Sequence, residues 1–567
     1  MDKNTQIRLN PIARFQRVLK TTFTQQTGSK WTVASFIIGL VLLAPALTVL
    51  FNLFAPSGDV WAHLLATVLP TYILNTLLLM LFVGFLSALA GVSTAWLTVT
   101  MDFPGRQFFA WALILPLATP AYIVAYVYTD LLEYAGPVQT ALRTATGWGY
   151  QDYYFPPIRS LGGAALMLSL VLYPYIYLLA RASFQRQSVA LIEAARTLRA
   201  SPWKVFWRVA LPTARPAIAG GMALVLMETI ADFGVVDFFG VQTLTTGVFR
   251  TWFSLGDPQA AGQIAAWLFI FAVALVLLEQ QSRRGQVANA TSRDSAIAPS
   301  KTSFAKGVGA ALFCSLPILF GFVLPTGILI ELTMTTGDPL LGRSFFDFVS
   351  NSLVVASLAA VLACVVAIIL AYAARLHPTK FNQTLIRLAT LGYALPGAML
   401  AIGILSLSTW LDSIFADTLK RLFGVTPGLI VTGTIGGLLF AYLCRFLTVA
   451  YNGVESGLQK VHGSLDFAAR SLGAGPGRVL RAVHLPMIRG SLISAMLLVF
   501  IDVMKELPAT LLLRPFNFET LATRVYRLAS DERLPEASTA ALVIVLVGLV
   551  PTIVLSISLA RSSKWQK

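Results

Sequence analysis

The sequence predicts an all-α polytopic membrane protein built from two similar halves. Hydrophobic residues make up 56% of the 567-residue chain and charged residues only 12%, whereas soluble globular proteins carry about 25% charged residues. Long apolar stretches recur along the whole chain, as expected of a protein whose main solvent is lipid. Short motifs also recur at nearly constant offsets, which indicates an internal duplication.

Twelve apolar stretches are candidates for membrane-spanning helices. Each holds roughly the 20 mostly apolar residues that cross the hydrocarbon core of a bilayer. The first stretch is too long for the apolar part of a signal peptide, so we expect it to be retained. The stretches are 33–54, 72–99, 108–130, 161–182, 216–236, 261–281, 306–330, 351–374, 385–407, 427–450, 490–512 and 537–560.

The distribution of lysine and arginine predicts that both termini lie in the cytoplasm. Cytoplasmic loops of multi-pass proteins carry an excess of basic residues. With the N-terminus inside, the cytoplasmic segments hold roughly three times as many basic residues as the outer ones, in line with this bias. The basic residues form no patch with interleaved aromatic residues, so the net charge of +16 does not indicate a nucleic-acid partner. We expect a multi-pass membrane protein with both termini on the cytoplasmic side.

Recurring motifs divide the chain into two halves of six stretches each. An even number of spans gives both halves the same orientation, so the repeats are parallel and related by an axis along the membrane normal. We predict a cytoplasmic segment 1–30, a first half 31–282, a polar cytoplasmic linker 283–305 and a second half 306–567. The motif pairs are Asn75-Thr76 with Asn351-Ser352, Pro120-Ala121 with Pro396-Gly397, Ala195-Arg196-Thr197-Leu198 with Ala469-Arg470-Ser471-Leu472, and Leu244-Thr245-Thr246 with Leu521-Ala522-Thr523.

One long cytoplasmic loop in each half follows a common plan. The loops span 183–215 and 451–489, and each has a run rich in Ala, Arg and Leu that favours a helix, then a turn and a closing Leu-Pro. Ser201 suits the start of a second helix in the first copy, and Gly473 suits the turn in the second copy. Aromatic residues such as Trp203 would be exposed on this short helix, which therefore needs a partner groove.

This plan resembles the EAA signature of binding-protein-dependent ABC importer permeases. The resemblance implies that each loop forms a coupling helix seated in a cleft of a separate ATPase subunit. Arg199 replaces the signature Gly in the first copy, and Phe467 replaces the Glu in the second copy, so the two contacts are expected to be unequal. The residues expected at the ATPase are Glu193, Ala194, Ala195, Arg199, Trp203, Pro212, Asp466, Phe467, Ala468, Ala469, Gly473 and Pro486.

Ionisable side chains inside the predicted spans mark a candidate path for the substrate. Such groups are costly in a membrane unless they face a cavity or a partner. Two pairs of carboxylates stand four residues apart, one pair in the fifth stretch and one in the eleventh. Residues at this spacing share a helix face, so the axis is expected to bring four carboxylates together. The path candidates are Glu228, Asp232, Asp237, Asp502, Lys505 and Glu506.

The four carboxylates Glu228, Asp232, Asp502 and Glu506 would suit a hard cation in transit, because such cations prefer oxygen ligands. The alternative is structural, with Lys505 neutralising a carboxylate and the others bracing a gate. No fixed metal site is expected, since the three cysteines and four histidines lack metal-ligand spacing. A group of tyrosines toward the outer side is expected in the aromatic belt of the membrane surface, with an iron contact as the alternative. These are Tyr122, Tyr126, Tyr128, Tyr173, Tyr175 and Tyr177.

Further stretches resemble the fused permeases of ferric-iron ABC importers, which have the type I importer fold. The resemblance implies a place in a bacterial inner membrane, a periplasmic ferric-binding protein at the outer face and two copies of an ATPase subunit below. The chain has no GxxxxGK[ST] phosphate loop, so ATP and Mg are expected on the ATPase and no cofactor in this chain. The stretches that carry the resemblance are 226–234, 239–241, 245–247, 252–257, 502–510, 521–526 and 529–532.

The resemblance implies alternating access, in which closure of the ATPase dimer is converted by the docking loops into rocking of the two halves. Fused permeases for thiamine, polyamines or phosphonates share this architecture and remain alternatives for the substrate. A secondary transporter driven by an ion gradient also has parallel six-span repeats, but it has no need of two matched loops. A membrane-embedded enzyme is a third alternative, which no nucleophile constellation in the sequence supports.

Overall fold

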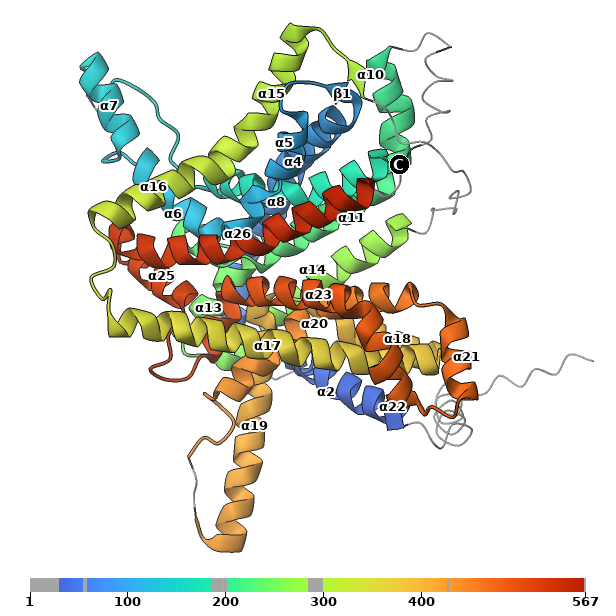
Figure 1. The fold of residues 1–567 in the computed structure, drawn as a ribbon. Helices are drawn as coiled ribbons and strands as arrows, with labels where there is room; N and C mark the ends of the chain where they lie inside the picture. The colour runs from blue at the N-terminus through green and yellow to red at the C-terminus, as the bar shows by residue number, and fades with distance from the viewer. Residues whose placement is uncertain are drawn as a thin grey trace, which may run out of the picture.

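The computed structural model describes residues 30–54, 59–149, 151–185, 187, 197, 201–283, 299–425 and 428–564. Within these ranges the chain is almost entirely helical, and Figure 1 shows its long helices packed into one bundle. The predicted N-terminal segment up to residue 29, most of the first docking loop before residue 201 and most of the linker lie outside the described residues. The prediction of an all-α multi-pass protein is confirmed.

The first half begins with the long helix α2 and ends with α14. Its described elements are α2 (Lys30–Asn52), α3 (Asp59–Thr67), α4 (Leu69–Thr100), β1 (Met101–Asp102), α5 (Arg106–Ala112), η1 (Leu115–Ala118), α6 (Ala121–Leu132), α7 (Pro137–Thr146), α8 (Leu161–Gln185), α10 (Pro202–Val205), η2 (Phe206–Ala210), α11 (Leu211–Ala231), α12 (Gly234–Phe238), α13 (Leu244–Phe253) and α14 (Pro258–Arg283).

The second half starts with β2, which pairs in parallel with β1 and so ties the end of the linker to the first half. Its described elements are β2 (Ser300–Lys301), α15 (Phe304–Ile318), η3 (Leu319–Val323), α16 (Leu324–Thr335), α17 (Arg343–Leu376), α18 (Lys380–Ala389), η4 (Thr390–Ala394), α19 (Gly397–Phe423), α20 (Ile435–Gln459), α21 (Gly463–Ser471), α22 (Pro476–Val479), η5 (Leu480–His484), α23 (Leu485–Met504), α24 (Pro508–Leu513), α25 (Leu521–Ser530) and α26 (Leu534–Lys564).

The long helices are fewer than the twelve stretches that the sequence predicts. Ten helices of the described chain are long and apolar enough to cross a membrane, or eleven when one bent pair counts as a span. The bent pair takes the place of the predicted stretch 108–130, and its two segments, Arg106–Ala118 and Ala121–Thr146, meet at 89°. The last predicted stretch, 537–560, lies within α26, whose part Leu534–Val550 is apolar but shorter than the other long helices.

A proline causes an equivalent break in each half. Thr119, which precedes Pro120, is extended with φ −98° and ψ 122°, and Leu395, which precedes Pro396, is extended with φ −89° and ψ 127°. The ring of a proline disfavours helical backbone at the residue before it. The predicted continuous helix 385–407 is therefore interrupted at the same point as its counterpart in the first half, and α6 and α19 both start directly after the proline.

The first helix of each half packs against the other half. Helix α2 contacts α17, α18 and α19, while α15 contacts α4 and α5. The hydroxyl of Ser35 in α2 donates to Oδ1 of Asn382 at 3.0 Å. In the opposite direction, the hydroxyl of Tyr128 in α6 donates to the carbonyl of Phe320 at 2.7 Å. The halves that the sequence separates at a linker are thus interlocked through their first helices.

Two of the recurring sequence motifs meet in space, where they hold the short helices α13 and α25. In the first half, Nδ2 of Asn75 donates to the carbonyl of Gln242 at 2.9 Å. Its counterpart Asn351 donates to the carbonyl of Glu519 at 3.1 Å. The hydroxyl of Thr76 accepts a hydrogen bond from the N–H of Leu244 at 3.1 Å. In the second half, the hydroxyl of Ser352 accepts one from the N–H of Leu521 at 2.8 Å. Both short helices also begin with a threonine capping box, which satisfies free N–H groups at a helix start.

Candidate functional site

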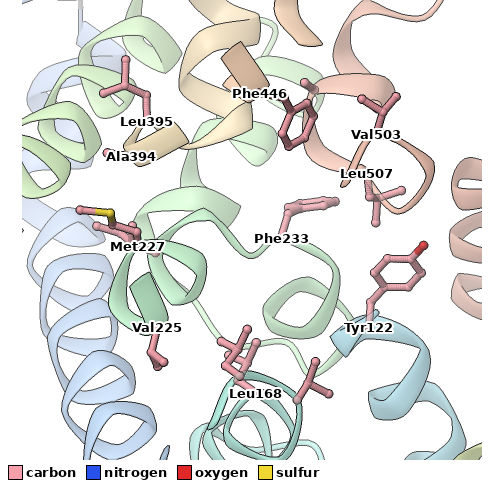
Figure 2. Packing of buried hydrophobic residues seen from close by; sticks show 14 of the residues in the cluster. Tyr122, Leu168, Val225, Met227, Phe233, Ala394, Leu395, Phe446, Val503 and Leu507 are labelled. Atoms are coloured by element: carbon pink, nitrogen blue, oxygen red, sulfur yellow. The ribbon is translucent and has the colours of Figure 1, made fainter. Parts of the chain in front are cut away.

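A cavity of about 110 Å³ lies between the two halves. Segments on both sides of the breaks in α11 and α23 line it, together with the start of α6 and parts of α8 and α20. Figure 2 shows apolar side chains of both halves gathered in this region, with Phe233 from the first half and Leu507 from the second. Five of the six path candidates that the sequence singles out line this cavity: Glu228, Asp232, Asp502, Lys505 and Glu506.

The carboxylates of each pair do not share a helix face, because both helices end between them. Helix α11 ends at Ala231 and α23 ends at Met504. The prediction of continuous helices over 216–236 and 490–512 is therefore wrong at these points. Glu228 and Asp502 lie within the last turns of α11 and α23, whereas Asp232 and Glu506 lie in the turns that follow.

Asp232 and Glu506 have the same role in the two turns, because each accepts backbone N–H groups of the helix that follows. Oδ1 of Asp232 accepts the N–H groups of Val235 and Val236 at 3.0 and 3.3 Å. The two carboxylate oxygens of Glu506 accept the N–H groups of Ala509 and Thr510, each at 3.0 Å. A carboxylate that accepts the free N–H groups at a helix start stabilises that helix. Both side chains therefore support the short helices that follow the breaks, α12 and α24.

The second half also supplies two cations to the cavity. Nη1 of Arg445 in α20 lies 3.0 Å from Oε1 of Glu506, and both side chains are almost fully buried. Nζ of Lys505 lies 3.1 Å from Oδ1 of Asp502. The sequence analysis missed Arg445, although a lone arginine within the apolar stretch 427–450 could have signalled it. The two carboxylates of the second half are thus each paired with a cation.

Gly397 leaves the space that the ion pair of Arg445 and Glu506 occupies. A Cβ atom at this position would lie 2.2 Å from Nη1 of the arginine and 2.7 Å from Oε1 of the glutamate. The residue at the equivalent position in the first half is Ala121. The extra methyl group is therefore excluded only in the half that carries the arginine.

We predict that Gly397→Ala displaces the buried ion pair and lowers the thermal stability of the purified protein. The loss should approach the ~3–5 kcal/mol of a broken buried pair. Ala121→Gly is the matched control, and we expect a loss of about 1 kcal/mol from helix propensity alone. Equal shifts of the unfolding midpoint for the two variants would contradict the steric role of Gly397.

Asp237 lies outside the cavity and belongs to a set of contacts that we call the outer bridge. Its Oδ2 accepts the hydroxyl of Tyr526 in α25 at 2.7 Å. Close in sequence to α8, Arg159 pairs with Glu133 of its own half and with Glu532 of the second half, the latter at 3.1 Å. The contacts of Tyr526 and Glu532 join the halves at α25 and at the turn that follows it. Figure 1 places α25 at the opposite end of the bundle from α10 and α21. The outer bridge therefore holds the two halves together at that end.

The second docking loop has the predicted helix–turn–helix form. Helix α21 ends at Ser471, and α22 begins at Pro476. Gly473 lies between them with φ +76°, a left-handed backbone that glycine adopts without steric cost. Phe467 and Leu472 project from this loop with 73% and 86% of their surfaces exposed. Two apolar side chains in this position form a surface that a partner could cover.

Asp466 faces the interior of the same loop. Its Oδ2 accepts a hydrogen bond from Nε of Arg375 at 2.9 Å, and its Oδ1 lies 2.6 Å from Nε2 of His484. The same arginine donates to the carbonyls of Leu458 and Val461 at 2.6 and 2.9 Å. The carboxylate of Asp466 thus fixes the loop to the end of α17, and its contact with an ATPase stays a prediction.

The other predicted docking residues are placed as follows. Ala468 is exposed and Ala469 half-buried in α21, and Pro486 is exposed at the start of α23. In the first loop, Trp203 is 69% exposed and stacks edge-on against Trp207, which is 50% exposed, and Pro212 is exposed in α11. The first-loop residues Glu193, Ala194, Ala195 and Arg199 lie outside the described residues.

Metal-ligating side chains do not gather into a permanent site in the described part of the chain. No group of three or more His, Cys, Asp or Glu side chains there could hold a metal ion. The three cysteines are buried and unpaired with one another.

The chain is similar to known proteins over most of its length. Residues 87–279 and 363–566 match the family described as binding-protein-dependent transport system inner membrane component. The Fe(3+)-transport system permease protein FbpB 2 of Haemophilus influenzae is 26% identical over 487 residues, covering 85% of this chain and 88% of the relative. The putative ferric transport system permease protein FbpB 1 of the same organism is 25% identical over 541 residues, covering 88% and 80%. The molybdenum transport system permease protein ModB of Escherichia coli is 28% identical over 190 residues, covering 33% and 80%.

Proposed function

Because the chain belongs to the family of binding-protein-dependent transport system inner membrane components, we propose that it is the permease of an ATP-driven importer of ferric iron. The chain is a multi-pass protein of the inner membrane, and this family works with an ATPase and a substrate-binding protein. The two matches correspond to the two halves of the sequence repeat, so one chain supplies both halves of the permease.

The assignment of ferric iron as the cargo rests on the charge of the cavity. Four carboxylates line the cavity against two cations, Arg445 and Lys505, and each cation is already paired with a carboxylate. This excess of negative charge suits a cation and opposes an oxyanion. Carboxylate and hydroxyl oxygens are the ligands of hard cations. Relatives named as ferric permeases cover most of the chain, whereas the molybdenum relative covers a third of it.

The docking loops support a separate ATPase in two copies. One loop per half gives two contacts related by the same axis, and each presents exposed apolar side chains, Trp203 and Trp207 in one and Phe467 and Leu472 in the other. Figure 1 shows α10 and α21 at the same end of the bundle. The sequence holds no phosphate loop of the GxxxxGK[ST] type. We therefore assign ATP and Mg to the ATPase subunits and no nucleotide site to this chain.

Alternating access requires that the outer ends of the halves separate and close again. The outer bridge joins the halves at the end opposite the docking loops, so we assign it to the state in which the path is closed to the outside. A substrate-loaded binding protein shifts the equilibrium only if it binds the open state more tightly. Its binding energy must therefore offset the contacts of the outer bridge.

We predict that Arg159→Ala weakens the outer bridge and raises ATP hydrolysis in the absence of binding protein. Exposed ion pairs contribute ~0–1 kcal/mol each, so the expected increase is about two- to fivefold. Arg159→Lys keeps the charge and should leave hydrolysis close to that of the wild type. Unchanged hydrolysis in Arg159→Ala would show that the bridge does not hold the outer end closed.

The experiment that tests the cargo is reconstitution with the ATPase and a panel of loaded binding proteins. We expect ferric-loaded binding protein to stimulate ATP hydrolysis, and proteins loaded with thiamine, a polyamine, a phosphonate or molybdate to leave it at the basal rate. Stimulation by one of these other proteins and not by the ferric one would overturn the iron assignment. It would leave the assignment to the permease family intact.

A further inference from the structure

The cavity is chemically unequal on its two sides, although the chain is a repeat. The carboxylates obey the repeat, because Glu228 and Asp502 occupy equivalent positions, as do Asp232 and Glu506. The cations do not obey it. The residue equivalent to Lys505 in the first half is Ala231, and both line the cavity.

The second cation shows the same inequality. Helices α8 and α20 have the same length, and the position of Arg445 in α20 corresponds to Val171 in α8. Both residues line the cavity. The second half therefore brings a cation for each of its carboxylates, and the first half has an alanine and a valine in their places.

The consequence is that carboxylate oxygens remain free mainly in the first half. Glu228 is half-buried, and within the described residues its carboxylate forms no ion pair or hydrogen bond, although it lies within electrostatic range of Lys505. Oδ1 of Asp232 accepts the N–H groups of both Val235 and Val236, and Oδ2 takes part in neither bond. By contrast, Glu506 accepts two N–H groups and the hydroxyl of Thr510 besides its pairing with Arg445.

Two hydroxyl groups on the same side of the cavity also lack partners. Oγ1 of Thr119 and Oη of Tyr122 find no hydrogen-bond partner in the described part of the chain. The two side chains are only 1% and 4% exposed, and leaving a buried hydroxyl unbonded costs about 1–3 kcal/mol. Both residues line the cavity, and Figure 2 shows the ring of Tyr122 directed from α6 toward Leu507.

These two hydroxyl groups have no counterparts at the equivalent positions of the second half. The equivalent residues in the second half are Leu395 for Thr119 and Ala398 for Tyr122. The second half therefore presents apolar side chains where the first half presents unbonded hydroxyls. The expectation that Tyr122 belongs to an aromatic belt at the membrane surface is not met, because the side chain is buried beside the cavity.

We propose that the cargo cation passes along the first-half side of the cavity, in contact with Glu228, Oδ2 of Asp232 and the hydroxyls of Thr119 and Tyr122. This proposal rests on the proposed function and adds which residues the cargo touches. Lys505 and Arg445 hold the carboxylates of the second half in internal ion pairs and keep them from binding the cargo. Few ligands then act at one time, so a hard cation is recognised by oxygen atoms yet released.

The paired cations also limit the charge of the empty cavity. Unpaired charges in a membrane protein are costly, and four unpaired carboxylates would attract cations of every kind. With Arg445 and Lys505 in place, two carboxylates, Glu228 and Asp232, are left to attract the cargo. The second half therefore sets the strength of attraction, while the first half supplies the contacts.

The test compares matched changes in the two halves, in proteoliposomes that hold the ATPase and are given ferric-loaded binding protein. Glu228→Gln changes one carboxylate of the first half without changing its size. The double variant Asp502→Asn with Lys505→Met removes the equivalent carboxylate of the second half together with its cation. Iron uptake and stimulated ATP hydrolysis are measured for each, and retained stimulation shows that a variant is assembled.

We expect Glu228→Gln to lower iron uptake per ATP hydrolysed by about tenfold or more, the effect of losing a contact to a charged group. Tyr122→Phe should lower it by about two- to tenfold, the loss of one neutral hydrogen bond. The double variant of the second half should stay within about threefold of the wild type, since a neutralised ion pair is often energetically neutral. Equal losses in Glu228→Gln and in the double variant would overturn the proposal, as would unchanged uptake in Glu228→Gln.

The outcome also separates this proposal from the assignment of iron. If another loaded binding protein stimulates the wild type, the same variants are measured with that cargo. Loss of uptake in Glu228→Gln with a different cation would sustain the first-half path and reject iron. Loss in Lys505→Met with an oxyanion cargo, with Glu228→Gln unaffected, would overturn the path itself.

Discussion

Changing Phe467 and Leu472 to aspartate should separate the permease from its ATPase. Both side chains are largely exposed in the second docking loop, at 73% and 86%, so the changes do not disturb a packed core. Apolar anchor residues at an interface commonly contribute 2 kcal/mol or more, which corresponds to about thirtyfold in affinity. We expect the ATPase no longer to co-purify with the variant and transport to stop.

An exposed apolar residue away from the docking loops provides the control. Phe516 is 96% exposed in the connection between α24 and α25. Changing it to aspartate removes a similar apolar surface near α25, at the opposite end of the bundle from α21 (Figure 1). Co-purification should be unchanged in this variant. Retention of the ATPase by the Phe467 and Leu472 double variant would show that the second loop does not dock it.

The second large effect is expected at the buried ion pair of Arg445 and Glu506. Arg445→Met leaves the glutamate buried without its cation, which costs ~3–5 kcal/mol. We expect a clear fall in the midpoint of thermal unfolding in detergent. The double variant Arg445→Met with Glu506→Gln replaces the pair by neutral groups and should recover most of the loss. The glutamine oxygen can still accept an N–H group of α24.

The order of these midpoints decides what the pair contributes. A double variant as unstable as Arg445→Met would show that the arginine acts through packing and not through its charge. Arg445→Met with an unchanged midpoint would show that Glu506 is protonated or solvated and needs no cation. The expected order is wild type, then the double variant, then Arg445→Met.

Much of the architecture could be predicted from sequence periodicity. The apolar runs predicted the long helices, and the recurring motifs predicted a repeat whose parts occupy equivalent places, such as Asn75 and Asn351. The helix–turn–helix of the second docking loop followed from helix formers around Gly473. The long helices and the docking loop depend on residues close together in the sequence, and the repeat is visible because similar short motifs occur in both halves.

The interruptions of the helices were harder to predict. Pro120 and Pro396 were visible as a repeated motif, but an apolar window does not register the bend that a proline imposes on the residue before it. Helices α11 and α23 also end just before Asp232 and Glu506, but no proline stands between either helix end and its carboxylate. These two carboxylates support the short helices that follow, α12 and α24. A polar residue inside an apolar stretch can thus be a helix cap as well as a path residue.

The partners of buried charges could not be predicted either, because they depend on packing between distant segments. Arg445 and Glu506 are 61 residues apart in the sequence, and nothing local to either residue indicates the other. The exchange of first helices between the halves is likewise a property of packing, as the contact of Ser35 with Asn382 shows. The repeat predicted two equivalent halves. The function proposed for the cavity depends on the positions at which the halves differ, such as Lys505 against Ala231 and Arg445 against Val171.

Iron accumulation in proteoliposomes that contain the permease, its ATPase and ferric-loaded binding protein tests the central claim most directly. The account predicts accumulation that requires ATP, stops when Phe467 and Leu472 are changed to aspartate, and falls about tenfold in Glu228→Gln. Accumulation that continues without ATP, driven by an ion gradient alone, would contradict it and favour a secondary transporter.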